Sequence, residues 1–257
     1  MAAPAKTGRK KVGRTWVHIA LEAKSRFAIG MLVGPRTQTM ATALVVSVAM
    51  ASAGGPPLFL IDDHRPYPAA LLQVYGEIKH RRRRHGRGPK RKPALKPPPG
   101  LLVGVVQKVR DAKGHLQKVK RKGLFGTARA IEARIRKLPI GRLINTSHLE
   151  RFNGTVRSRQ SRLTRRTQQI SRRDDLLQTG LWIFRDIYNW IKVHGSLHGC
   201  TPAMALGLTD HIWSLWEYVC YPVHVSDIQR DIWAEQRQEL QESAVDRRVR
   251  KKTVPTS

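Results

Sequence analysis

The stretch at positions 145–157 is Asn-Thr-Ser-His-Leu-Glu-Arg-Phe-Asn-Gly-Thr-Val-Arg. It predicts a helix that contains its own N-cap residue. Thr146 or Ser147 can serve as the N-cap, because a short hydroxyl side chain accepts a hydrogen bond from the free amides of a first helical turn. The helix is expected to continue to about Arg166. One apolar side recurs at helical spacing, at Leu149, Phe152, Val156 and Leu163.

A second side of this helix carries Glu150, Asn153 and Arg157, which lie at i, i+3 and i+7. Glu150 therefore stands in the first turn, among arginines. Two interpretations of this carboxylate remain open. It is either a solvated counter-charge on a surface helix or a functional group, and the pattern alone favours the first.

The charge of the whole chain favours a polyanionic partner. The 257 residues include 48 lysines and arginines against 18 aspartates and glutamates, so the net charge is +30. Nucleic acid is the first candidate for such a field, with a ribonucleoprotein assembly or an anionic membrane surface as alternatives. Cys200 and Cys220 have no metal-type spacing, which indicates a reduced, cytoplasmic protein.

One uncharged stretch, residues 37–61, raises the question of a membrane span. Hydroxyl and amide side chains dilute it, and Gly-Pro residues end its helical part near Ala53. That part falls short of the ~20 residues that cross a bilayer. A buried helix over 39–53 is therefore expected, and the basic start of the chain has no apparent signal peptide.

The predicted elements follow a mixed α/β order. The expected strands are two antiparallel pairs, 16–21 with 27–33 and 101–110 with 117–121, and a buried central strand at 58–61 that ends at Asp62. The expected helices are 39–53, 68–75, 128–137, 174–192, 228–240 and a short one that begins at Thr201 and Pro202. Apolar residues on two sides of the 174–192 helix predict burial between layers.

Composition divides the chain into three segments. Residues 1–14 predict a basic, disordered start, 15–220 a folded domain, and 221–257 a charged helical tail. A basic loop rich in Pro and Gly interrupts the domain at 80–99. The basic residues expected to contact DNA there are Arg81, Arg82, Arg83, Arg84, Lys90, Arg91 and Lys92.

Asp62 and Glu150 are the two carboxylates predicted to act together. The carboxyl end of a buried strand is a usual position for functional groups, and carboxylates are the ligands that Mg²⁺ prefers. Asp63 is the rival of Asp62, since successive side chains of a strand point to opposite faces. A zinc site is the weaker reading of His194 and its neighbours, because no fourth ligand stands at a recognisable spacing.

Four motifs follow one another in the order seen in bacterial DDE transposases. They are Val33-Gly34-Pro35-Arg36-Thr37, Tyr67-Pro68-Ala69-Ala70-Leu71, Asn145-Thr146-Ser147 with Glu150-Arg151-Phe152-Asn153, and Tyr188-Asn189 with His194-Gly195-Ser196-Leu197 and Thr201-Pro202-Ala203-Met204-Ala205. Over about residues 15–220 the chain resembles the DDE-domain transposases of the insertion sequence 1 family.

This resemblance implies an α/β fold with a ribonuclease H-like mixed sheet flanked by helices. In that family three carboxylates hold two Mg²⁺ (or Mn²⁺) ions for DNA strand cleavage and transfer. The resemblance assigns Asp62 to the second carboxylate position and Glu150 to the third, and it implies that Arg157 and Asn153 contact DNA. The implied partners are double-stranded DNA, as transposon ends and target, and further copies of the chain, in the bacterial cytoplasm at the nucleoid and away from membranes.

Two departures from the family pattern lead us to expect impaired catalysis. The first carboxylate and its strand, which the family places ahead of the Trp16 strand, are missing from residues 1–14, and Glu22 lies in a hairpin turn. Asp63 stands where the family usually has Gly. A catalytically impaired transposase is therefore expected, and a non-catalytic, basic DNA-binding remnant is the alternative. An RNA-associated assembly protein is a third hypothesis.

Overall fold

The computed structural model describes residues 15–52, 55–79, 93–138, 140–164, 168–169 and 171–221. The chain divides into two compact units, Met1–Trp213 and Ser214–Ser257. In the second unit, α7 (Leu215–Cys220) begins with a capping box between Ser214 and Glu217. The expectations for residues 1–14, for Arg81, Arg82, Arg83, Arg84, Lys90, Arg91 and Lys92, and for the helix at 228–240 lie outside the described residues.

The first strand pair is confirmed. β1 (Trp16–Leu21) and β2 (Ala28–Gly34) form an antiparallel hairpin in which Trp16 lies opposite Gly34. The carboxylate of Glu22 accepts a hydrogen bond from the backbone amide of Lys24 at 3.0 Å. Glu22 therefore serves the turn of this hairpin.

Side chains from the helical residues 174–191 hydrogen-bond to the edge of β2 that lies away from β1. Asn189 accepts from the amide of Ala28 at 2.9 Å and donates to its carbonyl at 3.0 Å. Gln178 accepts from Val33 N at 2.7 Å and donates to Met31 O at 2.7 Å. Two amide side chains thus take the hydrogen bonds that a neighbouring strand would make.

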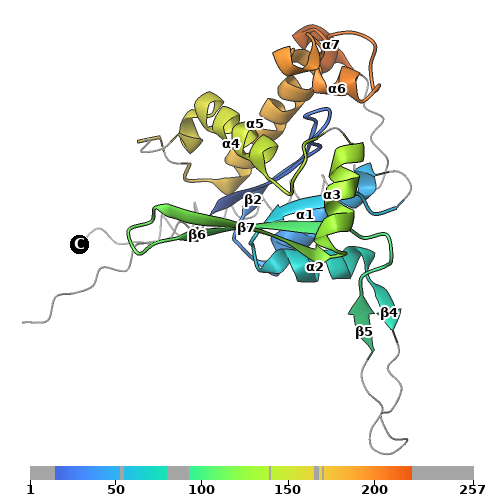
Figure 1. The fold of residues 1–257 in the computed structure, drawn as a ribbon. Coiled ribbons are helices and arrows are strands. Elements are labelled where there is room, and N and C mark those ends of the chain that lie inside the picture. Colours follow the sequence, from blue (N-terminus) through green and yellow to red (C-terminus); the bar gives the residue numbers. More distant parts are fainter. Residues whose placement is uncertain are drawn as a thin grey trace, which may run out of the picture. The chain divides into compact units, whose positions relative to one another are not determined.

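The second sheet contains β3 (Phe59–Asp62), β6 (Val103–Arg110) and β7 (Leu116–Phe125) in the order β3-β6-β7. β3 runs parallel to β6. β6 pairs antiparallel with β7, and Figure 1 shows these two strands side by side. The expectation of a buried central strand is wrong, since β3 is half-buried and stands at an edge of this sheet. A short apolar run has the same pattern at an edge as in the centre.

A third, small pair forms at the base of the basic segment. β4 (Glu77–Lys79) and β5 (Ala94–Lys96) are antiparallel, with Glu77 opposite Lys96. Residues 94–96 were expected within a loop over 80–99. Their pairing places a strand at the end of that segment instead.

The predicted helices within the described residues are confirmed as elements, with small shifts of their ends except at the carboxyl ends of the helices that begin at Ser147 and Asp174, which stop earlier than expected. They are α1 (Gln38–Ala51), α2 (Pro66–Tyr75), α3 (Ala128–Lys137), α4 (Ser147–Arg159), α5 (Asp174–Asp186) and α6 (Pro202–Ala205). α4 ends before the expected Arg166 and a 3₁₀ turn, η1 (Ser161–Leu163), follows. A π-helical turn, η2 (Ile187–Ile191), continues α5, and η3 (Gly195–Leu197) is a further 3₁₀ turn. Among the described helices, none combines the length and apolar character needed to cross a membrane.

Three apolar clusters bind the helices to the strands. α1 and α2 pack with Val103 of β6, whereas α3 and Ile144 pack with Val106 of the same strand. β2 packs against α4 and α5. The prediction that α5 is buried on both sides is wrong, since Leu176 and Ile183 are each 50% exposed. The described fold is a mixed α/β structure with both parallel and antiparallel pairing and with helices on the sheet faces.

Candidate functional site

The start of α4 differs from the expected cap. Thr146 occupies the N-cap position, but its side chain makes no capping hydrogen bond. Its hydroxyl instead donates to Glu150 Oε1 at 2.8 Å. The free amide of Ser147 is met by the side-chain oxygen of Asn145 at 3.2 Å. The cap threonine therefore holds the helix carboxylate in place.

Glu150 also has a cationic partner that the sequence did not reveal. Lys108 of β6 donates to Glu150 Oε1 at 2.7 Å, and the two side chains are 36% and 49% exposed. The hydrogen bond from Lys108 lowers the pKa of Glu150, burial opposes this, and the bond from Thr146 lowers it further. Glu150 is therefore a specifically paired, ionised carboxylate at neutral pH.

Strand register places Asp62 on the same face of the sheet as this ion pair. Asp62 lies opposite Val106 in the parallel β3–β6 pair, and Lys108 follows Val106 by two residues. Side chains of paired residues, and of residues two apart in one strand, point to the same face. Asp62 and Lys108, which binds Glu150, consequently share that face.

Asp63 belongs to the opposite face. Its carboxylate accepts a hydrogen bond from Gln107 Nε2 at 2.7 Å. Gln107 immediately precedes Lys108 on β6 and so points the other way. Of the two adjacent aspartates, Asp62 is the one on the Glu150 side.

A cavity of about 710 Å³ is lined by strands of two different sheets, β1 and β3. Residues of β1 and of β3, including Asp62, line it along their lengths, together with Asn153 and Thr146. Among the described strands, β1 pairs only with β2 and β3 only with β6. β1 and β3 therefore both line this cavity, and each has one edge that no described strand pairs with.

Two buried histidines and the exposed Arg36 line the same cavity beside Asp62. Arg36 Nη2 donates to His64 Nδ1 at 2.9 Å, and the ring centroids of His64 and His18 are 6.1 Å apart. Burial and the charge of Arg36 lower the pKa of His64. Since Nδ1 accepts, the proton of the neutral ring is on Nε2. That Nε2 is buried and has no hydrogen-bond partner in the described part of the chain.

The charge of Asp62 acts on neighbours of this group. Burial and the Asp62 carboxylate together raise the pKa of Tyr67 to about 12. The ring of Tyr67 meets that of His64 edge-on, with centroids 5.1 Å apart. Asp62 therefore lies near His64, Tyr67 and the Arg36 guanidinium, whereas Glu150 is hydrogen-bonded directly to a cation.

These residues do not make a ready site for Mg²⁺ or Mn²⁺. Carboxylate oxygens suit either ion, but the ammonium of Lys108 lies 2.7 Å from Glu150 Oε1. The described residues contain no group of three His, Cys, Asp or Glu side chains placed to hold a metal ion. A bound cation would have to displace Lys108 or bind only the outer oxygen of Glu150.

The two other α4 residues expected to contact DNA have different surroundings. Arg157 is exposed near the end of the helix, and Asn153 is half-buried where it lines the cavity. Sequence reasoning missed Lys108, Arg36 and His64 as neighbours of the carboxylates. The signal for Lys108 was its position two residues beyond the strand partner of Asp62, which requires the β3–β6 register.

Comparison with known proteins adds no relative to this description. No family model matches the chain, and neither does any curated protein or solved structure.

Proposed function

We propose that this chain binds double-stranded DNA as a protein of the DDE transposase type whose strand cleavage and transfer are impaired. The observation that carries the proposal is the joint position of Asp62 and Glu150 on one sheet face, with Glu150 held by Lys108. The first part supports the expected carboxylate pair. The second supports the loss of activity, because an ammonium already neutralises one of the two carboxylates.

The arrangement of the sheets supports the same proposal. β1 and β3 line one cavity, and among the described strands each pairs on one side only, so we propose one further strand between them. The cavity beside Asp62 therefore offers a place for the carboxylate-bearing first strand that the resemblance implies.

The net charge of +30 supports the DNA-binding part of the proposal. A protein that neutralises phosphates releases condensed counterions, so its affinity falls steeply as salt rises. Exposed cations such as Arg157 on α4 are accessible for contacts with phosphates. The non-catalytic remnant is the second candidate, and the Lys108–Glu150 ion pair is the observation that favours it.

Two measurements on the full chain test the proposal. The first follows binding of a fluorescent 30-base-pair duplex over a series of salt concentrations, with structured RNA as competitor. The second follows nicking of supercoiled plasmid in Mg²⁺ or Mn²⁺, with Asp62→Ala and Glu150→Gln as matched controls. We expect salt-dependent duplex binding and weak nicking that both substitutions abolish.

Each alternative has its own outcome. Duplex binding without any nicking, and with affinity unchanged in Glu150→Gln, would identify the non-catalytic remnant. Preference for structured RNA over duplex would reject the DNA proposal altogether. Vigorous nicking that depends on Asp62 would contradict the expected impairment.

A further inference from the structure

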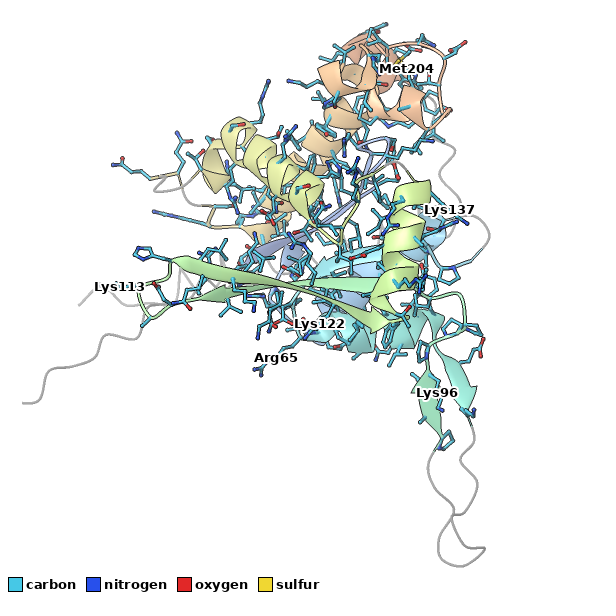
Figure 2. The ribbon with its side chains drawn as sticks, in the orientation of Figure 1. Arg65, Lys96, Lys113, Lys122, Lys137 and Met204 are labelled. Atoms are coloured by element: carbon cyan, nitrogen blue, oxygen red, sulfur yellow. The ribbon has the colours of Figure 1, made fainter. Side chains whose placement is uncertain are left out.

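The face of β7 turned away from Glu150 carries a row of lysines. Lys118, Lys120 and Lys122 alternate along the strand, and all three are exposed. Figure 2 shows Lys122 along the β6–β7 ribbon and Lys113 at its turn. We call Lys118, Lys120 and Lys122 the lysine face.

Register fixes the side of the sheet on which this row lies. Lys120 is opposite Gln107 and Lys122 is opposite Val105, without irregularity between these pairs. Paired residues share a face, and Gln107 points away from Lys108. The lysine face is therefore opposite the face that carries the Lys108–Glu150 ion pair.

The described residues show no structural role for these lysines. None of the three forms an ion pair within the described part of the chain, in contrast to Lys108. Asp63 is hydrogen-bonded to Gln107, the residue opposite Lys120, so its carboxylate belongs to the same side of the sheet as these lysines. Three cations thus share one exposed strand face with one carboxylate at its border.

We propose that the lysine face binds the phosphate backbone of duplex DNA. This inference rests on the proposed function and assigns part of the DNA contact to residues other than α4 and the basic segment around residue 85. Alternate strand residues are about 6.8 Å apart, so the row spans roughly 13.6 Å. Each of the three ammonium groups can contact one phosphate, so the row can neutralise up to three phosphates.

A different role for edge-strand lysines is to prevent pairing with another sheet edge. β7 is an edge strand in the order β3-β6-β7, so this role must be separated from DNA contact. The two roles predict different effects on DNA binding. Phosphate contacts set the salt dependence of the affinity, and edge protection does not affect it.

The test compares two triple variants of the full chain. The first is Lys118→Gln, Lys120→Gln and Lys122→Gln. The control removes the same charge from exposed positions elsewhere, as Lys24→Gln, Arg129→Gln and Lys137→Gln. Anisotropy of a fluorescent 30-base-pair duplex is titrated at several salt concentrations, and thermal unfolding confirms that both variants fold.

We expect the lysine-face variant to lower the magnitude of the slope of log K against log salt by up to about 2.7, at about 0.9 per lost phosphate contact. The control should lower it by less than one contact. A triple Lys→Arg variant keeps the charges and should keep the slope of the unaltered protein. Equal slopes for the glutamine variant and the control would overturn the inference. Aggregation of the glutamine variant, when the unaltered protein stays dispersed and binds duplex, would also overturn it, because the lysines would then serve to protect the sheet edge. Failure of the unaltered protein to bind duplex would refute the proposed function itself.

Discussion

The ion pair between Lys108 and Glu150 gives the most direct test of the candidate site. Both side chains are more than a third exposed, at 36% and 49%, so solvent screens their attraction. Exposed pairs couple by about 0.2–1 kcal/mol, and the additional bond from Thr146 fixes the carboxylate, so we expect a coupling of about 0.5–1 kcal/mol. For a chain of this size that corresponds to a change in Tm of about 1–4 °C.

A double-mutant cycle measures this coupling. Lys108→Gln, Glu150→Gln and the double variant are unfolded by denaturant near neutral pH, and the interaction energy is the departure from additivity. Lys120→Gln is the matched control, because it removes a neighbouring strand lysine that has no ion pair within the described residues. We expect the control to change the free energy of unfolding by less than about 0.5 kcal/mol.

The pH dependence of the coupling has a definite sign. The pKa of Glu150 in the folded chain lies below the ordinary value of 4.5. The stabilisation is therefore complete above the ordinary value and is lost as the pH falls through the lowered folded pKa. A coupling near zero at neutral pH, or one that persists after the carboxylate is protonated, would refute the reasoning.

Three further predictions concern the sheets. Asn189→Ala leaves both backbone groups of Ala28 without their partner, and we expect a loss of about 2–3 kcal/mol in the free energy of unfolding by urea. Gly104→Val should cost about 1–3 kcal/mol by the same measurement, since a Cβ at this position would lie 2.8 Å from a methyl group of the buried Ile144; a neutral result would show that this contact relaxes freely. Asp63→Asn removes the carboxylate beside the lysine face and should tighten duplex binding in the anisotropy titration, whereas weaker binding would indicate that Asp63 positions a DNA contact.

Local patterns predicted the elements that contain their own signals. The hairpin of β1 and β2 follows from two short runs rich in Val, Ile, Leu and aromatic residues on both sides of a polar turn. α6 follows from Thr201 and Pro202, and the hydroxyl of Thr201 does accept a hydrogen bond from Met204 N at 3.2 Å. These features depend on residues a few positions apart, so the sequence alone contains them.

Features that depend on long-range packing were not predictable in the same way. Apolar residues on α5 suggested burial on both sides, but Leu176 and Ile183 remain exposed because only one side faces β2. The hydroxyl of Thr146 could bond either to the helix amides or to a carboxylate, and the position of Lys108 makes the second choice favourable. The partner of Glu150 lies 42 residues away on a strand whose register no local pattern specifies.

Because successive side chains of β6 point to opposite faces of the sheet, the two proposed activities lie on opposite faces. Lys108 points to the face with Asp62 and Glu150, and the residue before it, Gln107, points to the face with Asp63 and Lys120. A change on the first face alters carboxylate charge and nicking but leaves the lysine face in place. A change on the second alters phosphate contacts but leaves the Glu150 ion pair in place. If both faces serve one DNA-binding protein, nicking and salt dependence should respond to different substitutions, because a single strand presents consecutive side chains on opposite sides.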